Sequence, residues 1–362
     1  MRVLHIELGM NLYGGAKQVA FILRGLREQF AVENCLLAPE GSVIAQEMRA
    51  QGFEVQTIPA QGDLDFRLFW RIRRVIKQVQ PDLVHVHSRR GAEVWGGLAA
   101  RSLGVPAVIS RRVDNPENAW VAQQKYGWYQ KVITISDGIR QVLLAQGVPA
   151  EKVITVRSAV AEDATVACDR MAFRRRFALS QSDVVLGVVA QLIERKGHRF
   201  LLQTLPSLVR QYPNLRVIFF GQGAYRNVLE QEVEGLDLQN RVQFAGFCPD
   251  MPGLFGCLDL LVHPALMEGL GIALLQASQQ GVPIIASAVG GIPEAVQDGE
   301  NGLLVPPADC EALQQALARL LANAELRTQL GLCGKQRMRD HFSVAKMVEG
   351  NFQVYQEVLT KG

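Results

Sequence analysis

Residues 184–198 read VVLGVVAQLIERKGH, and the expected fold follows from this segment. Its first seven residues form an almost unbroken apolar run, which is typical of a parallel β-strand covered on both faces. A polar loop follows the run and leads into a segment with helical periodicity. A strand, a polar loop and a helix in this order predict one unit of a parallel α/β sheet.

The same alternation extends from this unit toward both ends of the chain. Helical periodicity is expected at 16–28, 66–78, 93–103, 311–322, 325–338 and 344–359. Further strands are expected at 3–8, 34–38, 55–58, 83–87, 107–110, 131–136, 153–156, 216–220, 242–245, 258–263 and 283–287. The chain is therefore predicted to contain two Rossmann-like, doubly wound α/β halves.

Length and composition set the domain count and exclude several classes of protein. At roughly 150 residues per domain, 362 residues indicate two domains, and the polar segment 158–169 is the predicted linker. Hydrophobic residues make up 48% and charged residues 20%, which excludes disordered and collagen-like chains. The sequence has no apolar run near the ~20 residues of a membrane span. It also begins without a signal-peptide pattern, so we expect a cytoplasmic protein.

Charge and cysteine content give two further expectations. Residues 1–160 hold 20 Lys and Arg against 14 Asp and Glu, whereas residues 161–362 hold 18 against 21. A basic first half favours an anionic partner, such as a phosphate group or an anionic membrane surface, although ordinary surface variation gives the same counts. The six cysteines, at 35, 168, 248, 257, 310 and 333, form no C-x-x-C pair. In a reducing compartment they are expected to be buried thiols rather than disulfides.

Two loops at predicted strand ends have the composition of phosphate sites. The loop 9–16 contains Gly14 and Gly15 ahead of a helix, where free backbone N–H groups can bind phosphate, although a plain tight turn is an equal alternative. In the loop 190–198, Arg195 and Lys196 are adjacent cations that suit a diphosphate leaving group. The alternative for this pair is a solvated basic turn.

A third loop, at 263–277, contains Glu268 just ahead of Gly269-Leu270-Gly271 and an apolar helix. Glu268 can accept hydrogen bonds from hydroxyl groups, and the glycine N–H groups can face an anion. Gln276 lies two helical turns farther on the same face. Glu268 could instead be a helix N-terminal carboxylate that complements the helix dipole.

These loops occur together with other ordered motifs along nearly the whole chain. They are Gly14-Gly15-Ala16, PDLVHVHS at 81–88, Arg195-Lys196-Gly197, Gly221-Gln222-Gly223, Gly246-Phe247, EGLG at 268–271, GVPIIAS at 281–287, GGIPE at 290–294 and DGENGLLV at 298–305. In this order the motifs resemble those of the family 4 retaining glycosyltransferases. That family has the GT-B fold, in which two Rossmann-like domains face each other across an interdomain cleft.

The resemblance implies that a sugar passes from a nucleotide-sugar, most commonly a UDP-sugar, to an acceptor with retention at the anomeric carbon. It implies no metal and no cofactor, with Glu268, Lys196 and Arg195 as the catalytic residues. The acceptor would be a glycan or a lipid-linked glycan of cell-envelope polysaccharide or lipopolysaccharide synthesis. Further donor contacts would come from Gly14, Gly15, Gly221, Phe247, Gly269, Leu270, Gly271 and Gln276.

The resemblance also divides the chain by role. Residues 1–160 would form the acceptor domain and residues 165–343 the donor domain. A last helix at about 344–362 would pack back on the first domain.

Three positions depart from the family pattern. Gln276 replaces the second Glu of the E-x7-E signature, and Gln191 replaces a basic residue that often precedes the Lys-Gly. A His near the reacting sugar aligns loosely with Arg111 or Arg112, which could bind a phosphate on the acceptor.

His85 and His87 alternate along one strand and are expected on one face, where they pack or line the cleft rather than bind metal. His87 joins Arg111 and Arg112 as an expected acceptor-binding residue. The aromatic residues of 120–129 and the basic segment 66–77 are typical of a contact with an anionic membrane, or simply of a helix that covers the sheet.

The sequence therefore predicts a cytoplasmic retaining glycosyltransferase that binds no nucleic acid, with a peripheral membrane contact as an added expectation. Two alternatives stay open: a nucleotide-sugar epimerase on the same fold, and a catalytically silent nucleotide-sugar-binding protein.

Overall fold

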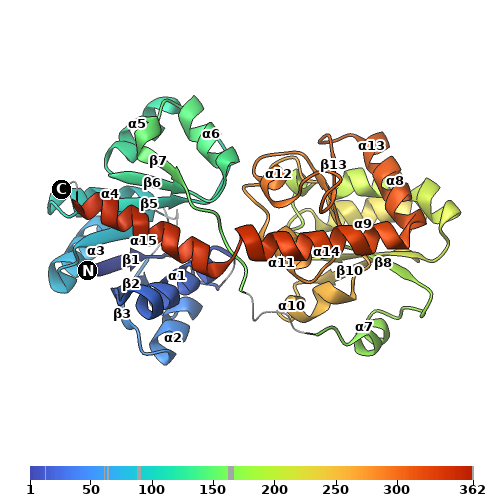
Figure 1. The fold of residues 1–362 in the computed structure, drawn as a ribbon, viewed down its shortest axis with the longest axis horizontal. Helices are drawn as coiled ribbons and strands as arrows, with labels where there is room; N and C mark the ends of the chain where they lie inside the picture. Colours follow the sequence, from blue (N-terminus) through green and yellow to red (C-terminus); the bar gives the residue numbers. More distant parts are fainter. Residues whose placement is uncertain (13, 61, 63–64, 88–90, 162–166, 361–362) are drawn as a thin grey trace. The chain divides into compact units, whose positions relative to one another are not determined.

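The computed structural model describes residues 1–12, 14–60, 62, 65–87, 91–161 and 167–360. The chain forms two compact units: Met1–Ala159 together with Val344–Gly362, and Val160–Ser343. In Figure 1 the first unit contains the blue and cyan elements and the red helix α15, Val344–Thr360. The chain thus returns to unit 1 at its end.

Unit 1 contains a seven-stranded sheet whose neighbouring strands are all parallel, in the order β3-β2-β1-β4-β5-β6-β7. The strand order reverses between β1 and β4, which is where ligands bind in open α/β sheets. The strands are β1 Arg2–Ile6, β2 Glu33–Pro39, β3 Glu54–Ile58, β4 Leu83–Val86, β5 Ala107–Arg111, β6 Lys131–Thr134 and β7 Val153–Thr155.

Helices cover both faces of this sheet because successive strand residues point to opposite sides. Val3 of β1 packs with residues of α1 and α15, whereas Leu4 packs with residues of α3 and α4. A Cβ on Gly25 of α1 would lie 2.5 Å from Cγ2 of Val348, so only glycine allows α1 and α15 to pack this closely. The helices are α1 Gly14–Phe30, α2 Val43–Ala50, α3 Arg67–Val79, α4 Ala92–Ser102, α5 Ala119–Gly127 and α6 Asp137–Ala145.

Unit 2 contains a six-stranded parallel sheet in the order β10-β9-β8-β11-β12-β13. Its order reverses between β8 and β11. The strands are β8 Val184–Val189, β9 Leu215–Phe220, β10 Val242–Gly246, β11 Leu260–His263, β12 Ile284–Ser287 and β13 Leu303–Val305. The helices are α7 Arg170–Arg176, α8 His198–Gln211, α9 Arg226–Gly235, α10 Met251–Leu254, α11 Ile272–Gln279, α12 Ile292–Ala295, α13 Cys310–Ala322 and α14 Ala324–His341.

The prediction of two doubly wound α/β halves is confirmed, and most strand ends differ from it by one or two residues. Strand β13 was not predicted, because its three residues were considered only as part of the motif DGENGLLV at 298–305. The prediction also missed the shorter helices α2, α5, α6, α7, α9, α10 and α12. Residues 162–166 of the predicted linker lie outside the described residues.

The expectation for the cysteines is wrong at four of the six positions. Cys168 and Cys257 form a disulfide, with their Cα atoms 5.5 Å apart. The two are 89 residues apart in sequence, so only the packing of unit 2 brings them together. Cys310 is only partly buried and Cys333 is exposed. Cys35 and Cys248 are buried thiols, as expected.

The described helices include none that is both long and apolar enough to cross a membrane.

Candidate functional site

Two loops at the carboxyl edge of the unit 2 sheet interlock beside the strand-order reversal. After β8 the chain makes a short 3-10 helix, Glu194–Lys196, and Gly197 follows with φ +70°. The backbone N–H of Leu266, in the loop after β11, donates to the carbonyl of Arg195 over 2.8 Å. A Cβ on Gly197 would lie 1.8 Å from the carbonyl oxygen of Pro264. Gly197 therefore allows the two loops to touch, and this contact positions Lys196.

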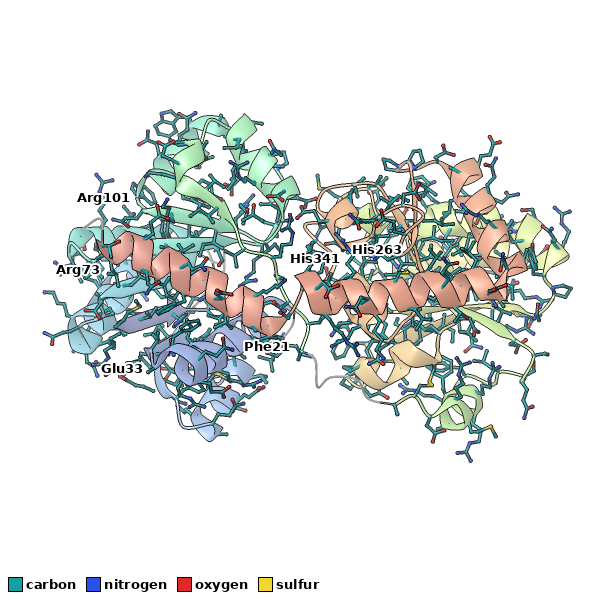
Figure 2. All side chains as sticks on the ribbon, in the orientation of Figure 1. Phe21, Glu33, Arg73, Arg101, His263 and His341 are labelled. Atoms are coloured by element: carbon teal, nitrogen blue, oxygen red, sulfur yellow. A yellow bond between two sulfur atoms is a disulfide. The ribbon has the colours of Figure 1, made fainter. Side chains whose placement is uncertain are left out.

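Lys196, Glu268 and His263 form a compact polar cluster in these two loops. Nζ of Lys196 lies 2.5 Å from Oε2 of Glu268, and Nε2 of His263 lies 2.9 Å from the same oxygen. The other carboxylate oxygen accepts a 3.1 Å hydrogen bond from the backbone N–H of Gly269. His263 is the last residue of β11 and is labelled in Figure 2. Both carboxylate oxygens of Glu268 are thus held in a defined orientation.

The electrostatics of the cluster keep Glu268 ionised. Burial by itself raises the pKa of this carboxyl group, but the hydrogen bond from His263 and the charge of Lys196 outweigh burial and lower the pKa well below its usual value. Glu268 is therefore an acceptor at neutral pH and cannot act as a proton donor. An ionised carboxylate beside an ammonium suits recognition of sugar hydroxyls next to a phosphate.

Other residues expected at the donor site lie in nearby loops of unit 2. Arg195 is exposed, unlike its neighbour Lys196, which is 8% exposed. A Cβ on Gly221 would lie 1.9 Å from the carbonyl oxygen of Ala190, so the loop after β9 packs on the loop after β8. Phe247, just after β10, is 54% exposed.

The segment after Glu268 leads directly into α11. Gly269, Leu270 and Gly271 are buried, and Gly271 caps the helix with φ +87°. Gln276 lies in the second turn of α11 and is partly exposed.

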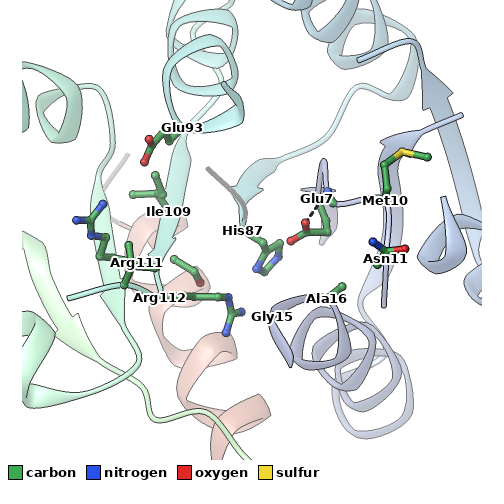
Figure 3. Close-up of a pocket in the computed structure, with 13 residues that line it drawn as sticks. Glu7, Met10, Asn11, Gly15, Ala16, His87, Glu93, Ile109, Arg111 and Arg112 are labelled. Atoms are coloured by element: carbon green, nitrogen blue, oxygen red, sulfur yellow. Dashed lines mark hydrogen bonds between the residues drawn. The ribbon is translucent and has the colours of Figure 1, made fainter. Parts of the chain in front are cut away.

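Unit 1 has its own cavity, of about 260 Å³, at the carboxyl ends of β1, β4 and β5. Figure 3 shows His87 between Glu7 and Arg112, with Gly15 at the start of α1 close to Arg112. A Cβ on Gly15 would lie 3.7 Å from Cδ of Arg112. The lining residues are Glu7, Gly9, Met10, Asn11, Gly15, Ala16, His87, Glu93, Ile109, Ser110, Arg111, Arg112 and Val113.

The two arginines predicted to bind an acceptor differ in their surroundings. Arg111 is 2% exposed, forms a 3.1 Å ion pair with Glu117 and donates to the carbonyl of Asn115 over 2.6 Å. Among the described residues, the one hydrogen-bond partner of Arg112 is Ser158, at a long 3.4 Å, and its Nε has no partner. Burial lowers the pKa of Arg112 to about 10, which keeps it cationic at neutral pH. Arg112 is therefore the better placed of the two for an anionic ligand.

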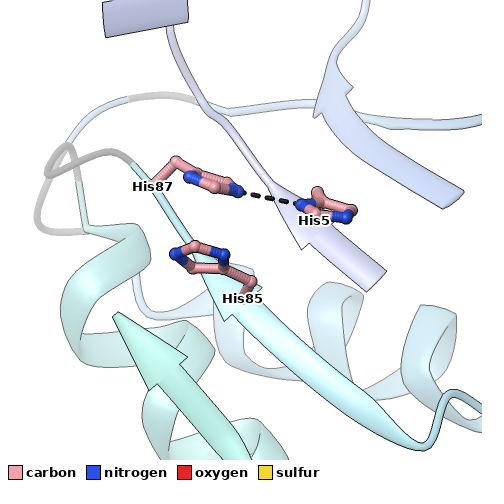
Figure 4. A group of neighbouring side chains, drawn as sticks. All are labelled: His5, His85 and His87. Atoms are coloured by element: carbon pink, nitrogen blue, oxygen red, sulfur yellow. Dashed lines mark hydrogen bonds between the residues drawn. The ribbon is translucent and has the colours of Figure 1, made fainter. Parts of the chain in front are cut away.

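The two strand histidines lie on one face, together with a third that the sequence analysis did not single out. The ring centroids of His85 and His87 are 3.7 Å apart, and His5 of β1 completes the group in Figure 4. One ring nitrogen from each of the three residues lies within 4.8 Å of those of the other two, the kind of grouping that can hold a metal ion. His85 uses both nitrogens in hydrogen bonds, to Tyr355 and to Ser110.

Sequence reasoning missed three functional candidates: His263, Glu7 and His5. His263 and Glu7 stand where a strand ends, and that position was a usable signal. His5 lies inside a strand, and only the pairing of β1 with β4 places it opposite His85.

Comparisons with known proteins agree with this architecture. The sequence model described as "Glycosyltransferase Family 4" matches residues 13–163, and that described as "Glycosyl transferases group 1" matches residues 169–337. The chain is 25% identical to the alpha-D-kanosaminyltransferase of Streptomyces kanamyceticus, over 81% of this chain and 85% of that one. It is 31% identical to a GDP-mannose-dependent alpha-(1-6)-phosphatidylinositol monomannoside mannosyltransferase of Mycolicibacterium smegmatis, over 48% and 47%.

A solved structure shows the same fold. Anabaena Alr3699/HepE in complex with UDP-glucose superposes with a TM-score of 0.87 at 19% identity, over 99% of this chain and 100% of that one. The two family models, each on its own half of the chain, and the fold shared with HepE lead to one conclusion. The chain belongs to the family 4 glycosyltransferases and has their GT-B fold.

Proposed function

We propose that this glycosyltransferase moves a hexosyl group from a UDP-sugar to a glycan or lipid-linked acceptor, with retention at the anomeric carbon and without a metal ion. The observation that carries the proposal is the Lys196–Glu268–His263 cluster, which has exposed Arg195 beside it. Residues 165–343 would bind the donor. Residues 1–160 and the last helix would bind the acceptor.

The chemistry needs positive charge where the diphosphate leaves. The bond between the anomeric carbon and the phosphate oxygen breaks, and its electron pair passes to that oxygen. Lys196 and Arg195 stabilise the charge that develops there, the role for which a metal ion would otherwise serve. Glu268 orients the sugar by accepting hydrogen bonds from its hydroxyl groups.

Retention is proposed from the resemblance to the retaining glycosyltransferases, and the constraint on Glu268 bears on how retention would be achieved. Both of its oxygens are held by Lys196, His263 and Gly269, which favours a positioning role over nucleophilic attack. Retention without a carboxylate nucleophile requires that the acceptor oxygen form its bond on the face that the diphosphate leaves. The hydroxyl proton passes to the departing phosphate oxygen, so charge and atoms balance.

The proposed donor base and the proposed acceptor class are inferred from different observations. HepE was crystallised in complex with UDP-glucose, whereas the name of the mycobacterial relative specifies GDP-mannose. UDP is therefore the proposed donor base, and GDP is the alternative to test. The unit 1 cavity offers Arg112 to a phosphate of the acceptor. A lipid-linked or phosphorylated glycan of cell-envelope polysaccharide or lipopolysaccharide synthesis has that chemistry.

Helix α3 supports a peripheral contact with the inner face of the cytoplasmic membrane. Phe66 and Trp70 are 63% and 64% exposed, and Arg67, Arg74 and Lys77 are also exposed. This spacing places apolar and basic groups on one face, as in helices that lie on anionic membranes. In liposome flotation, wild-type protein should bind anionic vesicles, and Trp70→Ala with Arg74→Gln should reduce binding at least fivefold. Equal flotation with neutral vesicles, or none with anionic ones, would refute the membrane contact.

The test of the main proposal combines ligand binding with turnover. A donor at about 100 times its Kd should stabilise the protein by about 2.7 kcal/mol, or on the order of 5–10 °C in Tm. We expect this shift with UDP-sugars and not with GDP-, ADP- or CMP-sugars. Turnover in EDTA, only with acceptor present and with an α-linked product from an α-linked donor, would support the proposal. Conversion of the donor without acceptor would indicate an epimerase, and binding without turnover a silent binding protein.

A further inference from the structure

The histidine group of unit 1 lies at the reversal of strand order, beside the cavity. His5 of β1 is directly opposite His85 of β4, and His87 follows β4 by one residue. His5 and His85 are fully buried and His87 is 2% exposed. Nδ1 of His5 lies 2.9 Å from Nε2 of His87, the contact drawn as a dashed line in Figure 4.

The amide of Asn34 sets the direction of this hydrogen bond. Its Nδ2 donates to the carbonyls of Val32 and Leu23, over 3.0 and 3.3 Å, so its Oδ1 is the atom that faces His5. That oxygen lies 3.0 Å from Nε2 of His5 and can only accept. The proton of neutral His5 is therefore on Nε2, and its Nδ1 has a lone pair.

The same reasoning then assigns His87. Because Nδ1 of His5 accepts, Nε2 of His87 must donate, and the remaining nitrogen Nδ1 of His87 has a lone pair. This atom is buried, has no hydrogen-bond partner among the described residues, and belongs to a side chain that lines the cavity. A buried acceptor without a partner costs free energy, which a bound donor group would recover.

The surroundings keep both rings neutral at physiological pH. Burial lowers the pKa of His5 to about 4, against the hydrogen bond with Asn34, which raises it. Burial also lowers the pKa of His87, and His85, His5 and the cation Arg112 lower it further. A neutral His87 keeps its lone pair.

We propose that Nδ1 of His87 accepts a hydrogen bond from a hydroxyl group of the sugar acceptor, and that Asn34 and His5 are positioning residues that hold His87 in the required tautomer. This inference rests on the proposed function, because it places the acceptor in the unit 1 cavity. The cavity combines one hydroxyl acceptor, His87, with one cation, Arg112. It therefore suits a polyol in which a hydroxyl lies close to an anionic substituent.

Metal binding by the three histidines is the competing use of the same atoms. It would require the lone pair of His5 Nδ1 and a nitrogen of His87 to point at one ion. The present hydrogen bonds direct the proton of His87 at that lone pair instead, and His85 contacts Tyr355 and Ser110 with its two nitrogens.

The first test needs no substrate. The chain has six histidines, so ¹⁵N-histidine labelling and long-range ¹H–¹⁵N correlation spectra can resolve each tautomer, with His87→Asn and His5→Gln used for assignment. We expect His5 and His87 both with the proton on Nε2, unchanged between pH 6 and 8. In Asn34→Leu, which removes the acceptor oxygen that faces Nε2 of His5, His87 should gain the Nδ1–H form. A proton on Nδ1 of wild-type His87, or an equimolar bound metal, would overturn the inference.

The second test measures the acceptor directly. Asn can place an oxygen near the position of Nδ1, whereas Ala cannot. We expect His87→Ala to raise the acceptor KM about tenfold with an unchanged donor KM, and His87→Asn to recover most of that loss. Asn34→Leu should act in the same direction, more weakly. Equal effects on the two KM values, or no recovery by Asn, would count against a role in acceptor binding.

The two tests separate failure of this inference from failure of the proposed function. If no donor is turned over but the tautomers are as assigned, the proposed transfer fails and the hydrogen-bond chain stands. If transfer occurs and the tautomer differs, the assignment of His87 fails alone.

Discussion

The ammonium of Lys196 lies 2.5 Å from a carboxylate oxygen of Glu268, although 72 residues separate the two in sequence. Their side chains are only 10% and 16% exposed. A pair this well shielded from water interacts more strongly than an exposed ion pair. The contact links the loop after β8 to the loop after β11, and it fixes the positions of the two charged groups.

Removing the positive charge of this pair should slow transfer. Lys196→Gln is expected to lower kcat by about 10²–10³-fold, because a fixed charge on a developing oxyanion contributes about that factor. Initial rates at saturating donor and acceptor measure it. Arg319→Ala, which removes an exposed cation of α13, is the matched control and should behave as wild type. Lys196→Gln with more than half of wild-type kcat would show that this charge does not act on the leaving group.

Arg195 should affect the donor without affecting folding. Its side chain is exposed, so Arg195→Ala is expected to leave Tm within about 1 °C. The loss of a charge-assisted hydrogen bond to the diphosphate should lower kcat/KM for the donor by about 10- to 100-fold. The affinity for the nucleoside diphosphate alone, measured by isothermal titration calorimetry, should fall by a similar factor. Arg319→Ala is again the control. Unchanged diphosphate affinity would assign Arg195 to the solvated turn that the sequence left open.

The glycine after Lys196 should be intolerant of any side chain. Gly197→Ala places a Cβ 1.8 Å from the Pro264 carbonyl oxygen in a backbone with φ +70°. Urea unfolding should show that the free energy of unfolding falls by at least about 3 kcal/mol, because backbone strain and steric overlap both destabilise the variant. Gly299→Ala isolates the strain, since Gly299 has φ +74° and nothing within 4 Å of the added Cβ, and it should cost about 1–2 kcal/mol. Equal losses in the two variants would mean that the loops separate easily.

Substitutions of Arg111 and Arg112 should affect different properties: stability for Arg111 and acceptor binding for Arg112. Arg111→Ala removes one of two cations that pair with Glu117, which keeps Lys125, and is expected to cost about 2 kcal/mol for the lost charge-assisted hydrogen bonds. Arg112→Ala should change stability much less and raise the KM of a phosphorylated acceptor about tenfold. Urea unfolding and acceptor kinetics on both variants are the measurements. An unchanged acceptor KM in Arg112→Ala would remove the phosphate from the proposed acceptor.

Stability should fall as the pH drops below about 6.5, because buried histidines are neutral in the folded chain. Burial lowers the pKa of His198 to about 3, and the charges of His263 and Lys196 lower it further. The unfolded chain binds a proton near pH 6.5, so folding loses ~1.4 kcal/mol per pH unit for each such histidine until the folded pKa is reached. His198→Leu should therefore be stabilised relative to wild type by about 2 kcal/mol more at pH 5 than at pH 7.5.

Chemical denaturation at the two pH values measures this difference. His341→Leu, at an exposed position near the end of α14, is the control. Parallel pH profiles for wild type and His198→Leu would mean that His198 is hydrated in the folded protein.

Local patterns determined the architecture and pointed to the candidate donor residues. Apolar runs and helical periods indicated both parallel sheets, because burial on two faces needs such runs wherever they occur. Strand β13 was not recognised within the motif at 298–305, and the shorter helices α2, α5, α6, α7, α9, α10 and α12 were missed. Lys196 and Glu268 could be selected because each stands in a loop where a strand ends, next to glycines that allow close backbone approach.

Tertiary structure alone decided which side chains meet. It made Lys196 a buried partner of Glu268 and left Arg195 exposed. It paired Arg111 with Glu117, joined Cys168 to Cys257, and linked Asn34 to His87 through His5. Strand order within a sheet and the packing of loops bring together residues far apart in the chain. A hydrogen bond or disulfide between them depends on distances that no local pattern encodes.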